Sequence, residues 1–170
     1  LTSKNPFPKA KILPHREVWI SPKKEIWVKG ETLFKGYVEQ KQISLPLKKK
    51  KWFPTGDLGQ IVNGRHLEVT GRKDNMFISG GENIQPEEIE KHLTQLAQVE
   101  EAVVVPSRHK EFGHRPVAFL KLNPNEKLNQ KMLTRLLKEN LPKFKIPDQF
   151  YVWPEELHKE EGKILRKKLL

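Results

Sequence analysis

The sequence contains no cysteine, which excludes disulfides, thiolate metal sites and cysteine nucleophiles. It also lacks any apolar run near the roughly 20 residues that a membrane-spanning helix needs, and it shows no signal-peptide pattern. No group of His, Asp and Glu has the spacing of metal ligands, so no metal-binding residue is expected. We therefore expect a cytoplasmic protein with no membrane span.

The whole chain has a net charge of +11, and its positive charge is concentrated in residues 1–71. Residues 1–71 contain 14 Lys and Arg against 6 Asp and Glu, whereas residues 72–170 contain 18 against 15. Four lysines at positions 48–51 favour a solvated loop, and contact with a polyanion such as nucleic acid, ATP or CoA is the alternative. No helix-turn-helix, zinc-finger or stacked-aromatic pattern accompanies them, so a basic nucleic-acid-binding module is the weaker hypothesis.

Residues 1–73 are expected to be rich in β-structure. The predicted strands lie at residues 16–20, 25–29, 60–62 and 66–69. The last two flank Asn63 and Gly64, a strong hairpin signal. Residues 39–51 are expected to form a polar loop. Because the segment holds little core material, it is interpreted as a fragment of a larger body.

Residues 74–170 show alternating helical and strand patterns. Pro86 suits the first turn of a helix, whose buried face would carry Ile89, Leu93 and Leu96. Asn129 is a plausible N-cap for a second helix. Strands are predicted at residues 102–105, 116–122 and 150–153, and a short basic helix at 163–170. The predicted fold is α+β, with a three-stranded sheet and flanking helices after a β-rich segment.

Three polar residues between positions 57 and 74 could contact a nucleotide or act as a hinge. Asp57, in a Thr-Gly-Asp sequence between glycine-assisted turns, could accept hydrogen bonds from a ribose diol, or it could bond its own backbone. Arg72 follows a glycine and could reach a phosphate or a ribose. Asp74 lies where the composition changes and could act as a hinge, or it could belong to an ordinary linker.

Two further segments could contact a ligand in the second part. Gly80 and Gly81 would let the backbone approach a ligand closely, although a tight turn is the alternative. The glutamates of the following helix argue against a bound phosphate there and favour a loop that lines a channel. Lys163 follows a glycine near the end of the sequence and could neutralise a carboxylate or a pentavalent phosphate, or it could belong to a solvated basic tail. His109 and His114 are interpreted as structural or solvated residues.

Taken in order, these segments resemble the late motifs of the adenylate-forming superfamily, which holds acyl- and aryl-CoA ligases, peptide-synthetase adenylation domains and luciferases. The matching segments are EIWVKG at 25–30, FKGY at 34–37, TGD at 55–57, GRKD at 71–74, GGENI at 80–84, EEIE at 87–90 and GK at 162–163. Within the superfamily, residues 79–90 and 111–118 most resemble the o-succinylbenzoate–CoA ligases of menaquinone biosynthesis. The last motif departs from many relatives, in which proline and then basic, threonine and serine residues precede the Gly-Lys pair, whereas residues 157–161 here read LHKEE and place two glutamates next to Lys163.

The resemblance implies a role for each candidate residue. Asp57 would bond the ribose hydroxyls of ATP, and Arg72 would also contact the nucleotide. Asp74 would be the hinge. Lys163 would be the catalytic residue that orients the substrate carboxylate and ATP during adenylation, and Gly80 with Gly81 would line the channel for the pantetheine arm of CoA.

The resemblance also implies the organisation and partners of the whole enzyme. Residues 1–73 would end a large, barrel-like N-terminal domain, and residues 74–170 would form a mobile C-terminal domain. The reaction would use a carboxylic acid, ATP with Mg²⁺, and CoA as co-substrate. Another fatty or aryl acid is the alternative substrate. The chain would need the N-terminal part of the same enzyme and would be inactive alone.

Overall fold

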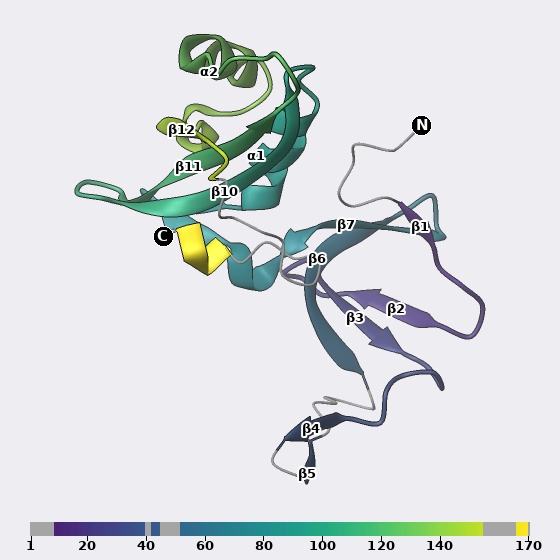
Figure 1. Ribbon diagram of the computed structural model, residues 1–170. Coiled ribbons are helices and arrows are strands. Elements are labelled where there is room, and N and C mark those ends of the chain that lie inside the picture. The colour runs from purple at the N-terminus through teal and green to yellow at the C-terminus, as the bar shows by residue number, and fades with distance from the viewer. Residues whose placement is uncertain (1–8, 40–41, 45–51, 155–165, 170) are drawn as a thin grey trace. The chain divides into compact units, whose positions relative to one another are not determined.

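The computed structural model describes residues 9–39, 42–44, 52–154 and 166–169. The chain divides into two compact units, one ending at Asp74 and the other beginning its continuous part at Asn75 (Figure 1). The prediction that the first unit ends a larger N-terminal domain, and that the second is mobile, stays a prediction.

An antiparallel five-stranded sheet forms the N-terminal unit, in the order β1-β7-β6-β3-β2 (Figure 1). Its strands are β1 (Ala10–Lys11), β2 (Glu17–Ile20), β3 (Glu25–Lys29), β6 (Phe53–Val62) and β7 (His66–Arg72). The predicted strands near residues 16–20 and at 25–29 are confirmed. A separate hairpin joins β4 (Tyr37–Glu39) to β5 (Gln42–Ser44). The prediction of a loop over residues 39–51 is therefore wrong at 42–44, where pairing with β4 forms a strand, and residues 45–51 lie outside the described residues.

The predicted hairpin at Asn63 and Gly64 is present, with φ angles of 51° and 69°. Val62 pairs with His66 across it. Strand β6 is much longer than expected and takes in the Thr-Gly-Asp sequence, which was predicted to lie between turns. It is a strand because it pairs with β3 on one side and β7 on the other. Gly59 permits this, since a Cβ there would lie 2.4 Å from the carbonyl oxygen of Glu68.

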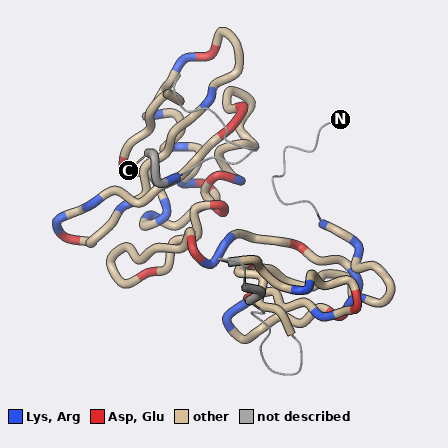
Figure 2. Tube along the Cα trace, turned by 60° about the horizontal axis from the view of Figure 1, so that its bottom comes forward, with Lys and Arg blue, Asp and Glu red and all other residues tan. Residues whose placement is uncertain are grey.

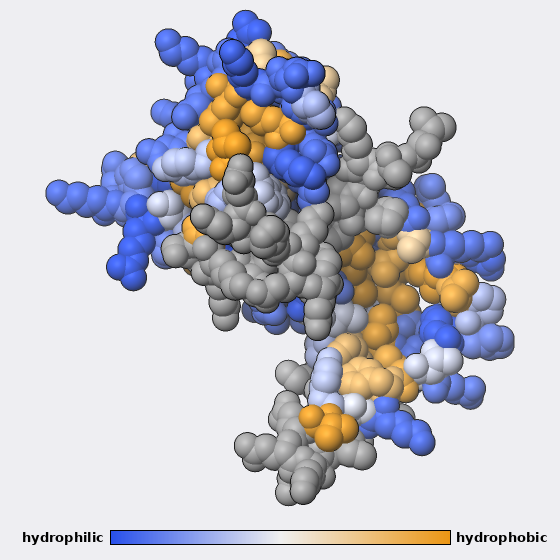
Figure 3. Space-filling view, in the orientation of Figure 1, coloured by the Kyte–Doolittle hydropathy of each residue, from blue (hydrophilic) through white to orange (hydrophobic). Residues whose placement is uncertain are grey.

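Few apolar side chains are fully buried in the N-terminal unit. Among its described residues, Ile26 is the only buried apolar side chain. Aromatic rings pack at the surface instead: the centroids of Trp19 and Trp27 are 5.6 Å apart, and Trp19 stays 46% exposed. Figure 3 shows apolar side chains at the surface of this unit. The stability of this unit therefore depends more on strand pairing and on contacts between partly exposed aromatic rings than on a deep core.

A three-stranded sheet forms the centre of the C-terminal unit, as predicted. β10 (Val99–His109) pairs antiparallel with β11 (Gly113–Leu122), which pairs parallel with β12 (Gln149–Val152). The other elements are η1 (Lys73–Asn75) at the boundary, β8 (Phe77–Ser79), β9 (Glu82–Ile84), α1 (Pro86–Thr94), α2 (Gln130–Lys138), η2 (Lys143–Lys145) and η3 (Arg166–Leu169). Alternate residues of the strands point to opposite faces of the sheet. One face therefore carries the main core and the other a smaller apolar cluster.

Helices α1 and α2 share the main core with one face of this sheet (Figure 1). Pro86 occupies the first turn of α1, and Ile89 and Leu93 are buried as predicted. Asn129 caps α2, because its side-chain oxygen accepts from the Met132 N–H at 3.1 Å. The opposite face of the sheet carries Val103, Val105 and Val117, with Phe119, Trp153 and Leu169 packed against them.

Of the range 163–170, expected to be a short basic helix, the structure describes residues 166–169, which form the 3-10 helix η3. Lys163 lies outside the described residues. Three positions further along the sequence, Arg166 is described and makes several contacts with the C-terminal unit.

Candidate functional site

Asp57 and Arg72, predicted to contact a nucleotide, are paired in the structure. They face each other across β6 and β7, and Arg72 Nη1 donates to Asp57 Oδ1 at 2.9 Å. The Asp57 side chain is 34% exposed and that of Arg72 47%, so solvent and ligands can reach the pair. Such a guanidinium can hold the carboxylate in one orientation.

The other residues of the Thr-Gly-Asp sequence support this pair. Thr55 Oγ1 donates to the Ile26 carbonyl at 2.9 Å and accepts from the Asp57 N–H at 3.0 Å. Gly56 has φ = 76°, and a Cβ there would lie 3.3 Å from Arg72 Nη2. Threonine therefore ties the segment to β3, and glycine leaves room for the guanidinium.

Asp74, the predicted hinge, lies in η1 at the boundary between the units. Its carboxylate lies 3.6 Å from Arg72 Nη2 and its side chain is 78% exposed. An exposed ion pair of this kind contributes little to stability, about 0–1 kcal/mol. The structure thus brings Asp57, Arg72 and Asp74 together, with the guanidinium between two carboxylates.

Gly80 and Gly81 form the two-residue turn between β8 and β9, with φ angles of 57° and 88°. Positive φ at both central residues is typical of a type I′ turn and favours glycine. A Cβ on Gly80 would lie 3.0 Å from Phe112 Cδ1, whereas one on Gly81 would meet nothing within 4 Å. The backbone at Gly81 is therefore open to a ligand.

Phe112, at the tip of the β10–β11 hairpin, supports the glycine turn. Its carbonyl accepts from the Gly80 N–H at 3.0 Å. The His109 ring stacks on it at 5.0 Å, and His109 Nδ1 accepts from the Glu111 and Phe112 N–H groups. His109 thus shapes the hairpin tip through its ring and its nitrogen.

Arg115 connects the β8–β9 turn to the loop before β12. Its guanidinium donates to both Asp148 oxygens, at 2.7 to 3.2 Å, and to the carbonyls of Phe144 and Ile146. It also reaches Ser79 Oγ at 3.5 Å. The sequence pattern gave no role to Arg115, although it lies within residues 111–118, which carry part of the family resemblance.

Glu87, Glu90 and Arg166 form a second group that the sequence did not reveal. Glu87 is 2% and Glu90 7% exposed, so both carboxylates are buried. Asn75 and Gln85 donate to the Glu87 carboxylate, and Arg166 pairs with Glu90. The signal that could have found this group is the i, i+3 spacing of Glu87 and Glu90, which places the two carboxylates side by side on the helix.

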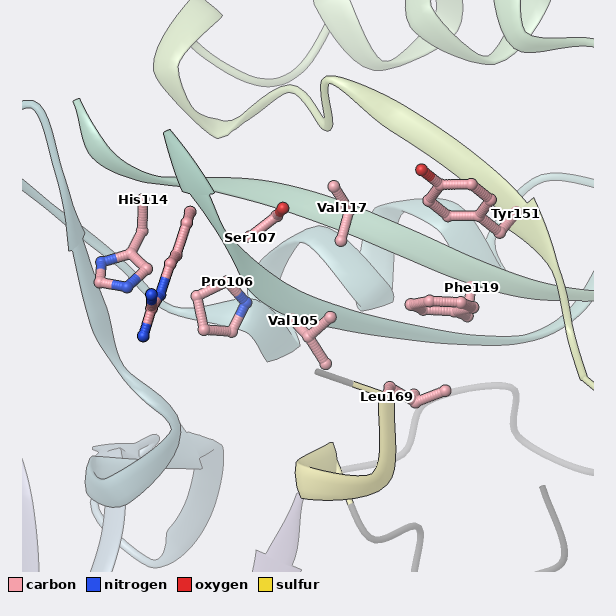
Figure 4. A pocket seen from close by; sticks show the side chains of 9 residues that line it. Val105, Pro106, Ser107, His114, Val117, Phe119, Tyr151 and Leu169 are labelled. Carbon is pink, nitrogen blue, oxygen red and sulfur yellow. The ribbon is translucent and has the colours of Figure 1, made fainter. Parts of the chain in front are cut away.

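A pocket of about 740 Å³ lies on the face of the three-stranded sheet that carries Val105 and Val117 (Figure 4). Val105 and Phe119 line it together with Leu169 of η3, and His114 and Ser107 lie toward its other end. None of the predicted site residues that the structure describes lines it. We assign no chemistry to this pocket.

Several charged side chains in the described part of the C-terminal unit form internal ion pairs. Figure 2 shows Lys and Arg interspersed with Asp and Glu along its trace. Lys145 pairs with Glu88 at 2.6 Å and Lys121 with Glu100 at 2.8 Å. In the described part of the chain, no group of three His, Asp or Glu residues could hold a metal ion. None of the described helices is long and apolar enough to cross a membrane.

Comparison with known proteins gives consistent relatives. Residues 88–163 match the AMP-binding enzyme C-terminal domain family. The chain is 45% identical over 147 residues to 2-succinylbenzoate–CoA ligase from Haemophilus influenzae, covering 85% of this chain and 32% of that protein. It therefore spans about a third of the length of that relative.

Solved structures of related ligases have the same fold. The R195K variant of E. coli MenE with bound OSB-AMS superimposes with a TM-score of 0.81 at 37% identity, over 92% of this chain and 33% of that one. o-Succinylbenzoate CoA synthetase (MenE) from Bacillus subtilis, in complex with the acyl-adenylate intermediate OSB-AMP, gives 0.80 at 34% identity, over 92% and 34%.

Proposed function

We propose that this chain is the C-terminal part of an ATP-dependent carboxylic acid–CoA ligase of the adenylate-forming enzymes, because residues 88–163 match the AMP-binding enzyme C-terminal domain family. The proposed acid is 2-succinylbenzoate, as used in menaquinone biosynthesis. The observation that carries this proposal is the 45% identity with the Haemophilus influenzae ligase across 85% of the chain. The missing two thirds would hold most of the active site.

In the first proposed half-reaction, a carboxylate oxygen of the acid attacks the α-phosphorus of ATP, and pyrophosphate leaves. Both reactants are anions, so a positioned ammonium lowers the barrier. We assign that role to Lys163, which lies outside the described residues. Asp57 would accept hydrogen bonds from the ribose hydroxyls, and Arg72 would contact the nucleotide. The 2.9 Å bond between them supports this assignment, because it orients a carboxylate that solvent can still reach.

In the second half-reaction, the CoA thiol gives up its proton to solvent and its sulfur attacks the acyl carbon. The C–S bond forms, the acyl C–O bond to the phosphate breaks, and AMP leaves. The thiol must travel on a thin pantetheine arm, and the open backbone at Gly81 suits a close approach by such an arm. Gly80 would hold the turn against Phe112. Rotation of the C-terminal unit about Asp74 would exchange the Lys163 surface for the glycine turn.

Mg²⁺ is proposed to arrive with the ATP phosphates. The described residues provide no cluster for it, and no step of the reaction is assigned to it here. A cytoplasmic location is part of the same proposal.

The test uses the full-length enzyme, in which this chain follows the proposed N-terminal part. Pyrophosphate release is measured with ATP and 2-succinylbenzoate, benzoate or a fatty acid. We expect release with 2-succinylbenzoate and thioester formation once CoA is added. If pyrophosphate were released only with another acid, that acid would replace 2-succinylbenzoate as the proposed substrate. Release of pyrophosphate without any carboxylic acid would overturn the proposed function.

Lys163→Ala separates the two half-reactions. It should cripple acyl-adenylate formation and spare thioester formation from supplied acyl-adenylate. The matched control is Lys121→Gln, which removes an exposed lysine paired with Glu100 on the sheet and should change neither rate. An equal loss in both half-reactions would refute the role of Lys163. Binding of DNA or RNA with a steep salt dependence would instead favour the nucleic-acid alternative.

A further inference from the structure

The side chain of Arg115, on β11, is fixed by the loop that leads into β12. Its Nε and Nη2 donate to the Asp148 carboxylate at 2.7 to 3.2 Å. Nη1 donates to the Phe144 carbonyl at 2.7 Å, and Nη2 donates to the Ile146 carbonyl at 3.1 Å. The side chain is only 13% exposed. Because the donors of a guanidinium point in fixed directions, these acceptors hold Arg115 in one orientation.

The same guanidinium also contacts the surroundings of the glycine turn between β8 and β9. Its Cζ lies 5.9 Å from the centroid of the Phe112 ring, within the range of a cation–π interaction. Nη1 lies 3.5 Å from Oγ of Ser79, the residue before the turn, which is 2% exposed. The Phe112 carbonyl in turn accepts from the Gly80 N–H at 3.0 Å. Arg115 therefore links the loop before β12 to the glycine turn through two neighbouring residues.

The glycine turn needs this support because its own hairpin is short. β8 and β9 pair over only three residues each, and a two-stranded hairpin by itself is marginally stable in water. Ile84 anchors the base of the hairpin, since it is fully buried in the main core. Gly80 and Gly81, at the other end, have no side chains to pack, and Ile78 is 58% exposed. The position of the turn thus depends on its contacts with the tip of the β10–β11 hairpin and with Arg115.

We infer that Arg115 is a positioning residue for the CoA half-reaction. Through Phe112 and Ser79, it holds the turn at Gly80 and Gly81 where the pantetheine arm would pass. The inference rests on the proposed function, which assigns this turn to the pantetheine channel. Arg115 itself is assigned no contact with CoA, ATP or the acid. Its effect is confined to the second half-reaction, because adenylation does not use the turn.

A role for Arg115 in folding alone predicts a different result. If the guanidinium only fixed the loop through Asp148, its loss would destabilise the whole C-terminal unit and lower both half-reactions together. A positioning role lowers one half-reaction and spares the other. The two roles are therefore separated by measuring the half-reactions one at a time.

The test measures both half-reactions of Arg115→Met and Arg115→Lys in the full-length enzyme. Adenylation is followed by pyrophosphate release without CoA, and thioester formation is started from supplied acyl-adenylate at varied CoA concentration. In Arg115→Met, kcat/KM for CoA should fall about 10- to 100-fold, because a misplacement of about 1 Å can cost that much. Adenylation should stay within about twofold of the wild-type rate. Arg115→Lys should recover part of the loss, since an ammonium keeps the charge and loses the planar fork.

A double-mutant cycle tests whether Arg115 acts through Phe112. Phe112→Leu removes the ring and keeps the backbone carbonyl that accepts from Gly80. In the Phe112→Leu background, Arg115→Met should cost at least about twofold less in kcat/KM for CoA than in the wild type, because residues in contact couple by that factor or more. Losses that simply multiply would mean that the two residues act independently.

The matched control is Lys121→Met, which removes another cation from β11, where it pairs with Glu100 at 2.8 Å. It should leave both half-reactions near their wild-type rates. Thermal unfolding of every variant reports its folding. If Arg115→Met does not fold, Arg115→Lys takes its place in the rate comparison and in the cycle with Phe112→Leu.

The outcomes distinguish this inference from the proposed function. A wild-type enzyme without acid-dependent pyrophosphate release would overturn the proposed function, and unchanged thioester formation in Gly81→Ala would overturn the assignment of the turn to the channel. With an active wild type, three results would overturn only the role of Arg115: an unchanged kcat/KM for CoA, an equal loss in both half-reactions, or no coupling to Phe112. A selective loss of the CoA step that is coupled to Phe112 would support it.

Discussion

The turn at Gly80 and Gly81 allows a matched comparison, because the two glycines have similar backbone conformations and different surroundings. Alanine at either position would have to adopt a positive φ, which costs about 1–2 kcal/mol for an L-residue. At Gly81 the new methyl group meets no atom within 4 Å. At Gly80 it would lie 3.0 Å from Phe112 Cδ1. Any difference between the two substitutions therefore reports on Phe112.

The size of that difference depends on the contacts that the Phe112 ring loses when it moves. Carbon atoms pack best about 3.5–4.0 Å apart, so the ring has to move away from the new methyl group. Movement would disturb its stacking on His109, whose centroid lies 5.0 Å away. Aromatic stacking contributes about 0.5–1.5 kcal/mol. We expect Gly81→Ala to destabilise by about 1–2 kcal/mol and Gly80→Ala by about 2–3 kcal/mol.

Urea unfolding followed by circular dichroism measures these free energies. A double-mutant cycle with Phe112→Ala then isolates the contact. In the Phe112→Ala background, the cost of Gly80→Ala should fall to that of Gly81→Ala, whereas the cost of Gly81→Ala should not change. Equal costs for the two glycines in the wild-type background, with no coupling to Phe112, would refute the reasoning.

Three further results are expected. Asp57→Asn in the full-length enzyme should raise the KM for ATP about 10-fold or more, because hydrogen bonds to charged groups contribute about 1.5–3 kcal/mol. Steady-state kinetics at varied ATP concentration measures this KM. An unchanged KM would contradict the ribose contact. Asp74→Pro should slow thioester formation more than adenylation, and unchanged rates in both assays would remove the hinge role. Leu137→Ala should cost about 2–5 kcal/mol in urea unfolding, since this leucine is 1% exposed in the core, and a cost below about 1 kcal/mol would mean that the site collapses around the cavity.

Local patterns predicted the parts of the fold that depend on neighbouring residues. Helix α1 begins with Pro86, and Asn129 caps α2, because a cap or a first-turn proline acts within a few residues. The strands of the C-terminal sheet were recognisable as continuous apolar runs. The hairpin at Asn63 was predicted from its turn residues for the same reason.

Long-range pairing decided the parts that the sequence did not predict. Strand β6 continues through the Thr-Gly-Asp sequence because β3 and β7 pair with it on both sides, which no local pattern encodes. As a result, Asp57 lies in a strand opposite Arg72 and not in a turn. Arg166 was missed because its partner Glu90 lies 76 positions away in the sequence. A basic tail and an acidic helix start both favour a solvated interpretation until they are seen in contact.

The buried glutamates change the argument about what the start of α1 can bind. An acidic first turn by itself is unfavourable for a bound phosphate. In the structure, however, Glu87 accepts from Asn75 and Gln85, and Glu90 is neutralised by Arg166. These carboxylates therefore hold the C-terminal unit together, and repulsion of an anion at the glycine turn is not their main effect. Two of the predicted site features are held by contacts within their own units: Asp57 by Arg72, and Gly80 by Phe112. A rotation about Asp74, which stays a prediction, would leave these contacts intact, as alternation between two half-reactions requires.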